Sequence, residues 1–169
     1  MPLLIAVCGI HEIDAFQSDL EPTHAVSLLD PDELWPRVDG VTAENHLTLP
    51  VHDISQPMLG FTHPQKAHIR ALIDFGERMR PTIESDEARV LVHCFAGISR
   101  SVAAAFALTC QLTNLTEIEA LRSIQDHRPQ MWPNELIVTL SDKLLGRRGR
   151  MVAALEAWRS QHLYTGRIL

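Results

Sequence analysis

The sequence lacks several features that would assign it to a common class of protein. Its three cysteines are an odd number without paired spacing, which argues against a disulfide framework or a zinc motif and favours a reducing, cytoplasmic setting. No apolar run approaches the ~18 residues of a membrane span, and the apolar start of the chain has no cationic flank typical of a signal peptide. Repeats and low-complexity tracts are also missing.

Positive charge is scarce as well. Lysine and arginine total 15 against 21 acidic residues, a net charge of −6, which argues against a nucleic acid or an anionic membrane as partner. A hydrophobic share of 46% and a charged share of 21% are ordinary for a globular protein. The length of 169 residues allows a real core, and we expect residues 1–169 to form a single domain.

Apolar runs and helical periodicities alternate along the chain. The predicted strands are residues 3–8, 24–29, 46–51 and 89–93, and the predicted helices are residues 10–18, 64–79, 101–112, 116–126, 134–145 and 150–159. This order predicts an α/β fold with a central, mainly parallel sheet of four to five strands and helices on both faces. The helix over 101–112 is apolar on all sides and should be buried, whereas residues 80–87 resemble a polar, proline-containing loop.

The most informative stretch follows the fourth predicted strand. Residues 93–101 read His-Cys-Phe-Ala-Gly-Ile-Ser-Arg-Ser, so a cysteine at a strand end is joined by a short loop to a helix that begins near Arg100. Gly97 allows a positive φ that turns successive N–H groups inward, and the helix N-terminus adds free N–H groups. Arg100 supplies a planar fork for two phosphate oxygens. The predicted phosphate-binding residues are Phe95, Ala96, Gly97, Ile98, Ser99 and Arg100.

The chemistry of this loop centres on Cys94. The helix N-terminus and the neighbouring cation favour the thiolate, which is the nucleophilic form, so Cys94 is predicted to attack phosphorus and form a phosphocysteine. The Ser101 hydroxyl is placed to stabilise the thiolate as a leaving group, and His93 is predicted to orient the loop through a ring N–H. The alternative is a buried structural cysteine at the end of a strand.

The nine residues match the His-Cys, five residues, Arg-Ser signature, and the sequence therefore resembles the cysteine-dependent protein tyrosine phosphatases. The Ala-Gly-Ile-Ser-Arg-Ser version is most similar to the dual-specificity branch. Together with Pro133-Asn134 and the helix after it, the resemblance is closest to small bacterial tyrosine-phosphatase-like proteins and covers about residues 45–150. It implies the phosphatase fold and catalysis without a metal or cofactor.

The family mechanism also requires a general acid for the leaving oxygen. Asp53 lies just after the strand over 46–51, where ligands gather in a parallel sheet, and the resemblance assigns it this role, followed by that of the base that activates water. The competing interpretations are a turn or N-cap residue, with His52 as a rival proton donor. Asn134 either holds the phosphate loop or a water, or caps the helix that begins beside it.

The predicted function is hydrolysis of phosphate monoesters, with phosphotyrosine in a protein or peptide as the expected substrate. The loop has no lysine, which argues against inositol phosphates. A phosphate-binding module without turnover and a phosphatase for a non-protein ester are the alternatives. Arsenate reductase would need further nearby cysteines, and rhodanese-like sulfur transfer would not require Asp53. The oligomeric state stays open.

Two further positions carry open alternatives. Cys8 ends the first predicted strand, which should lie beside the strand of Cys94, so it is either a buried apolar residue or a resolving thiol for oxidised Cys94. The run Asp126-His127-Arg128 is interpreted as a solvated helix end, with a proton relay or substrate contact as the alternative.

Overall fold

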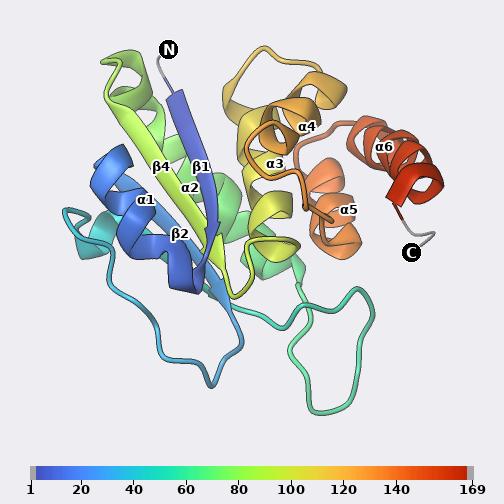
Figure 1. Cartoon of the computed structure of the whole chain (residues 1–169), viewed down its shortest axis with the longest axis horizontal. Coiled ribbons are helices and arrows are strands. Elements are labelled where there is room, and N and C mark those ends of the chain that lie inside the picture. Colours follow the sequence, from blue (N-terminus) through green and yellow to red (C-terminus); the bar gives the residue numbers. More distant parts are fainter. Residues whose placement is uncertain (1–2, 167–169) are drawn as a thin grey trace.

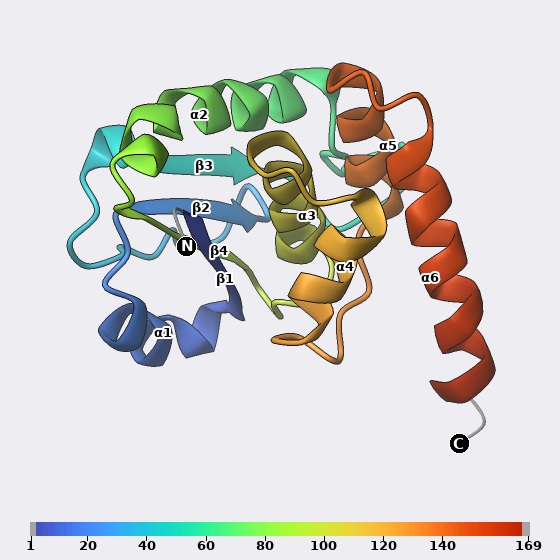
Figure 2. The same cartoon turned by 90° about the horizontal axis from the view of Figure 1, so that it is seen from above.

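The computed structural model describes residues 3–166. Within that range the protein forms one sheet of four parallel strands in the order β1-β4-β2-β3 (Figure 1 and Figure 2). The strands are β1 (Leu3–Gly9), β2 (His24–Leu29), β3 (His46–Pro50) and β4 (Ala88–Cys94). The predicted α/β class and parallel sheet are therefore confirmed, and the strand bounds differ from the predicted ones by only one residue at either end.

The register of the sheet determines what lies near Cys94. β1 pairs with β4 so that Cys8 is opposite His93 and Gly9 is opposite Cys94. Because all four strands run in the same direction, the loops that follow them gather at one edge of the sheet. The expectation that the strands of Cys8 and Cys94 are neighbours, ending on the same side, is confirmed.

The helices cover both faces of the sheet unequally. Helix α1 (Ile13–Leu20), preceded by a 3₁₀ turn over Ile10–Glu12, packs on one face against β1 and β4, while α2 (Lys66–Glu84) and α3 (Arg100–Leu112) cover the other face (Figure 2). Beyond α3 lie α4 (Glu117–Gln125), α5 (Glu135–Leu144) and α6 (Arg150–Gly166). No helix among residues 3–166 combines the length and apolarity needed to cross a membrane.

Helix α3 is the centre of the larger core cluster. Every residue from Arg100 to Cys110 is buried, and the helix contacts three strands as well as α2, α4 and α5. Its small side chains allow this close approach on all sides, as the sequence predicted. The N-terminus of α3 is consequently held rigidly at the strand edge where the signature loop lies.

Helix α2 departs from the prediction. It begins at Lys66 and continues through Pro81 to Glu84, where the sequence indicated a loop from residue 80. Pro81 is exposed and lies in the last turn of α2. It has no N–H to donate, but the hydrogen bond lost is near the end of the helix, where helical bonds are weakest. The Arg80 guanidinium also donates to Glu77 at 2.6 Å across this turn, which supports the continuation.

Candidate active site

The structure places Cys94 at the floor of a loop between β4 and α3. The residue is 2% exposed, and its Sγ accepts a hydrogen bond from the Gly97 N–H at 3.2 Å. The Ser101 Oγ lies 3.0 Å from the same sulfur. Both groups stabilise a negatively charged sulfur if the hydroxyl donates. Gly97 has a φ of +69°, as predicted, and a Cβ there would meet the Gly9 nitrogen at 2.5 Å.

The carbonyl groups of residues 95–99 in the signature loop all accept hydrogen bonds from donors outside the loop, which turns them away from Cys94. These bonds are Ile10 N to Phe95 O at 2.9 Å, Arg128 Nη2 to Ala96 O at 3.3 Å, Arg128 Nε to Gly97 O at 3.1 Å, Trp132 N to Ile98 O at 2.7 Å and Asn134 N to Ser99 O at 3.2 Å. Because a trans peptide carries its N–H opposite its C=O, the loop amides face inward. They form an anion cradle above the sulfur.

Arg128 has a role that the sequence analysis missed. It is 4% exposed, so the interpretation as a solvated helix end is wrong for this residue, although Asp126 and His127 are exposed. Its Nη1 donates to Glu12 at 3.0 Å, and Glu12 in turn accepts from the Gly9 N–H at 2.6 Å. The bond from Arg128 is the main cause that lowers the pKa of Glu12. Arg128 thereby links two carbonyls of the signature loop to Glu12 in the 3₁₀ turn after β1.

We expect Arg128→Met to weaken phosphate binding about tenfold, because two loop carbonyls lose their donor and the amides lose their fixed direction. The substitution should also lower the melting temperature. The measurements are the Kd of inorganic phosphate and a thermal melt, with Arg122→Met on the exposed side of α4 as the matched control. An unchanged phosphate Kd in a folded Arg128→Met protein would contradict this role of Arg128.

One nitrogen of the Arg100 guanidinium is engaged in hydrogen bonds, and another has no acceptor in the described part of the chain. Its Nη1 donates to the Asp30 carboxylate at 2.7 Å and to the Val51 carbonyl at 2.7 Å. Its Nε is buried and has no partner among residues 3–166, although a buried donor without an acceptor is costly. The Nε edge is therefore available for a phosphate oxygen. Arg100 also lines a pocket of about 220 Å³ together with Asp30, Glu33 and Phe95.

The structure brings Asp53 and Asn134 together at the loop. Asp53 Oδ1 accepts from Ser99 Oγ at 2.6 Å and from Asn134 Nδ2 at 2.9 Å. Asn134 also accepts from the Ile137 N–H at 3.0 Å, so it caps α5, while its own N–H holds the signature loop. The N-cap interpretation of Asn134 is therefore confirmed, and its role in holding the phosphate loop stays a prediction. Asp53 is exposed, and these two bonds hold its carboxylate beside the cradle.

His52 is engaged elsewhere. Its Nδ1 accepts from the Thr62 N–H at 2.9 Å, and its ring meets the edge of Phe61 at a centroid distance of 5.0 Å. Whether it rivals Asp53 as a proton donor stays a prediction. The geometry of Asp53, directly bonded to the signature loop through Ser99, favours Asp53 for the role.

His93 belongs to a buried chain of hydrogen bonds. Its Nδ1 lies 3.4 Å from the Cys94 carbonyl, and its Nε2 lies 2.5 Å from the Ser27 hydroxyl, which is 2.7 Å from His46 Nε2. Burial lowers the pKa of His93 to about 4, so the ring is neutral at pH 7. Because a carbonyl oxygen only accepts, His93 Nδ1–H is the donor to Cys94, and Ser27 then donates to Nε2 of the neutral ring. The role of His93 in orienting the loop stays a prediction.

Cys8 is one position away from the residue that pairs with Cys94 in the β1–β4 ladder, and its side chain lies on the opposite face of the sheet. It packs in the cluster beneath α1 with Ile13 and Leu91, whereas Cys94 packs in the α3 cluster. Burial raises the pKa of the Cys8 thiol to about 12, which keeps it protonated and unreactive. These facts favour the buried, apolar interpretation of Cys8.

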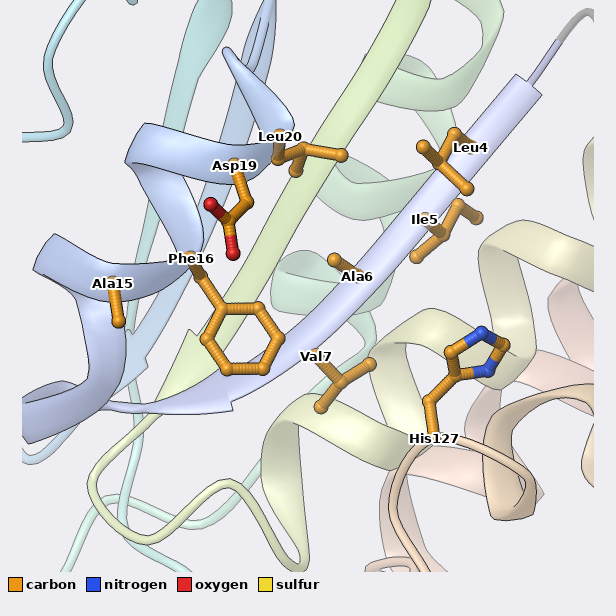
Figure 3. A pocket seen from close by; sticks show the side chains of 9 residues that line it. All are labelled: Leu4, Ile5, Ala6, Val7, Ala15, Phe16, Asp19, Leu20 and His127. Carbon is orange, nitrogen blue, oxygen red and sulfur yellow. The ribbon is translucent and has the colours of Figure 1, made fainter.

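A second pocket, of about 320 Å³, lies along β1 and shares no lining residue with the signature loop. Figure 3 shows Phe16 of α1 on one side of the strand and His127 on the other. Its walls are mostly apolar side chains, so it offers no cradle for an anion.

Comparisons with known proteins agree with this geometry. The fold is that of dual-specificity phosphatase structures: human DUSP28 has a TM-score of 0.62 at 19% identity, covering 93% of this chain and 94% of that one. DUSP15 has a TM-score of 0.60 at 22% identity, covering 96% and 92%. The family model of the dual specificity phosphatase catalytic domain matches residues 10–143. The chain belongs to this family, whose members are phosphoric monoester hydrolases.

The curated relatives that match this chain are much longer proteins, and the match covers only part of each of them. Dual specificity protein phosphatase 8 of Mus musculus is 25% identical over 122 residues, which are 72% of this chain and 17% of that protein. Dual specificity protein phosphatase 13B of Homo sapiens is 35% identical over 72 residues, 43% of this chain and 36% of that protein. The chain thus spans well under two thirds of the length of these relatives.

Proposed function

We propose that this protein is a protein tyrosine or dual-specificity phosphatase that works through a phosphocysteine on Cys94 and needs no metal. The observation that carries the proposal is the outward orientation of all five loop carbonyls around the Cys94 sulfur. An inward ring of amides together with the unpartnered Arg100 Nε matches the oxygens of a phosphoryl group. Family membership supports the same class of reaction.

The first step forms a sulfur–phosphorus bond. The Cys94 thiolate donates its electron pair to phosphorus as the ester bond breaks, and Asp53 gives a proton to the departing oxygen. The amides and Arg100 hold the charge of the equatorial oxygens. In the second step Asp53 accepts a proton from water, water attacks phosphorus, and the thiolate leaves with the Ser101 hydroxyl 3.0 Å from the sulfur.

The broader setting is part of the proposal. We infer a phosphorylated protein or peptide as substrate, a single phosphatase domain over the whole chain, a cytoplasmic location, and a closest kinship with small bacterial tyrosine-phosphatase-like proteins. The Ala-Gly-Ile-Ser-Arg-Ser run and the low cysteine content support these inferences. Hydrolysis of p-nitrophenyl phosphate in the presence of a chelator tests the activity and its independence of metal. Absence of hydrolysis would favour the phosphate-binding module.

We expect Asp53→Asn to slow esters with poor leaving groups by roughly 10²–10⁴-fold, because an amide cannot supply the proton that an alkoxide or phenoxide requires. Activated esters, which leave without protonation, should lose much less. The measurement is kcat/KM for phenyl phosphate and for p-nitrophenyl phosphate. Asp74→Asn, at an exposed position of α2, is the control. Equal small losses on both esters would transfer the role to His52 or to water.

A further inference from the structure

Large apolar side chains are exposed mainly around the candidate active site. Seven such side chains are exposed within the described part of the chain. Leu34, Met58, Leu59, Phe61 and Phe95 lie on the loops that follow β2, β3 and β4, and Leu4 and Leu115 lie elsewhere. Single exposed apolar residues are ordinary, but a group of them at one end of the molecule indicates a contact surface.

The three loops adjoin each other at the cradle. The loop after β2 reaches it through the Asp30–Arg100 pair at 2.7 Å, and the loop after β3 reaches it through the Asp53–Ser99 bond at 2.6 Å. Figure 1 shows these two loops, light blue and teal, extending on either side of the signature loop. We call Leu34, Met58, Leu59, Phe61 and Phe95 the apolar rim.

The loop after β3 is built to present its apolar tip. It is closed at its base by the His52 N–H to Thr62 carbonyl bond at 2.8 Å and at its tip by the Phe61 N–H to Met58 carbonyl bond at 3.1 Å. Gly60 has a φ of +82°, as the third residue of a type II turn requires. Leu59, the second residue of this turn, is 102% exposed. The turn thus holds the Leu59 side chain in solvent, where it buries no apolar surface and adds nothing to the stability of the core.

Acidic residues outnumber basic ones on the loops that carry the rim. Residues 30–42 hold Asp30, Asp32, Glu33 and Asp39 against Arg37, and residues 51–65 hold Asp53 and no lysine or arginine. The cradle itself attracts an anion through Arg100 and the amides. A ligand that binds both the cradle and the acidic residues 30–33 carries a phosphate and, next to it, a positive charge. An anionic membrane surface would be repelled by these acidic residues.

We propose that the apolar rim and the acidic loop over residues 30–33 bind the polypeptide on both sides of the phosphorylated residue. The substrate is then a protein segment that carries a large apolar side chain and a lysine or arginine within a few residues of its phosphotyrosine. This inference rests on the proposed phosphatase function and names the substrate class of that site. Met58 and Leu59 contact the apolar side chain, and Asp32 and Glu33 attract the cation.

The test compares two phosphotyrosine peptides of equal length, one with leucine and arginine beside the phosphotyrosine and one with serine and glutamate. For the wild type we expect kcat/KM to be about tenfold higher for the first peptide, since burying part of one apolar side chain and one weak charge attraction together amount to about that factor. In the double variant Met58→Ser/Leu59→Ser, the ratio of kcat/KM for this peptide to that for p-nitrophenyl phosphate should fall about fivefold. Leu115→Ser, at an exposed leucine outside the rim, should leave the ratio unchanged.

Asp32→Asn tests the charge. It should reduce the preference for the arginine peptide about twofold to threefold, and the preference should also shrink at about 0.5 M salt because exposed charges are screened. Glu156→Gln on α6 is the matched acidic control. A ratio that is unchanged in Met58→Ser/Leu59→Ser, or a preference for the glutamate peptide, would overturn the proposal.

Binding separates this proposal from the proposed function. Fluorescence anisotropy of the two labelled phosphopeptides with the Cys94→Ser protein measures recognition without turnover. If the wild type hydrolyses no ester but Cys94→Ser prefers the leucine–arginine peptide, the phosphatase assignment fails and the rim stands. If Cys94→Ser binds both peptides equally, or if sedimentation shows stronger binding to anionic vesicles than to either peptide, the rim proposal fails.

Discussion

Cys94→Ser is expected to lower kcat by about 10⁴-fold or more, because removal of a covalent nucleophile leaves only the contribution of the binding groups. The serine hydroxyl is a far weaker nucleophile than a thiolate. The cradle amides and Arg100 do not depend on sulfur, so the Kd of inorganic phosphate should stay within about threefold of the wild type. The measurements are p-nitrophenyl phosphate turnover and phosphate binding by calorimetry.

The matched control for this substitution is Cys8→Ala. It removes a thiol from the neighbouring strand but from the opposite face of the sheet, and it should keep turnover. A Cys94→Ser protein with turnover within tenfold of the wild type would exclude the phosphocysteine mechanism. Loss of phosphate binding along with turnover would instead mean that the loop had changed its structure.

Arg100→Lys is expected to lower kcat/KM by roughly 10²–10³-fold although the charge is kept. A lysine ammonium is a compact charge that cannot present two parallel N–H donors to two oxygens. It also cannot reproduce the contacts of Nη1 with both Asp30 and the Val51 carbonyl while facing the cradle. Steady-state kinetics with p-nitrophenyl phosphate and the Kd of phosphate provide the measurement.

The control for the arginine is Arg70→Lys, an exposed position on α2, which should behave as the wild type. Near-normal rate and phosphate affinity in Arg100→Lys would contradict the assignment of the unpartnered Nε edge to substrate. If Arg100→Lys weakens phosphate binding strongly but changes kcat little, Arg100 stabilises the bound substrate and the transition state equally.

The parts of the fold that depend on local patterns were predictable from the sequence. The buried strands, the apolar helix α3 and the capping box at Thr116, whose hydroxyl accepts from Glu119, follow from periodicity and end signals. The continuation of α2 through Pro81 did not follow, since a proline normally ends such a pattern. Its position in the last, exposed turn makes the difference, and that position is a property of the packed structure.

The candidate site divides in the same way. Cys94, Gly97, Arg100 and Ser101 stand in one contiguous motif, so their juxtaposition was predictable, and the assignment of Asp53 required both its position after a parallel strand and the family resemblance. Arg128 and Asp30 were not assigned, because their partners lie far away in sequence. The Asp30–Arg100 pair joins residues 70 apart, and the Arg128–Glu12 pair joins residues 116 apart. No local signal identifies such contacts in one sequence.

The distant contacts that hold the signature loop have a consequence for how the protein folds. Ile10 and Glu12 come from the start of the chain, and Arg128, Trp132 and Asn134 come from its later part, yet together they orient the loop carbonyls. Joining such remote segments costs loop-closure entropy, so we expect these contacts to form late in folding. A chain in which either segment has not yet docked would carry Cys94 without its cradle. We therefore expect the Cys94 thiol to acquire the stabilisation of its charged form only when both segments are in place.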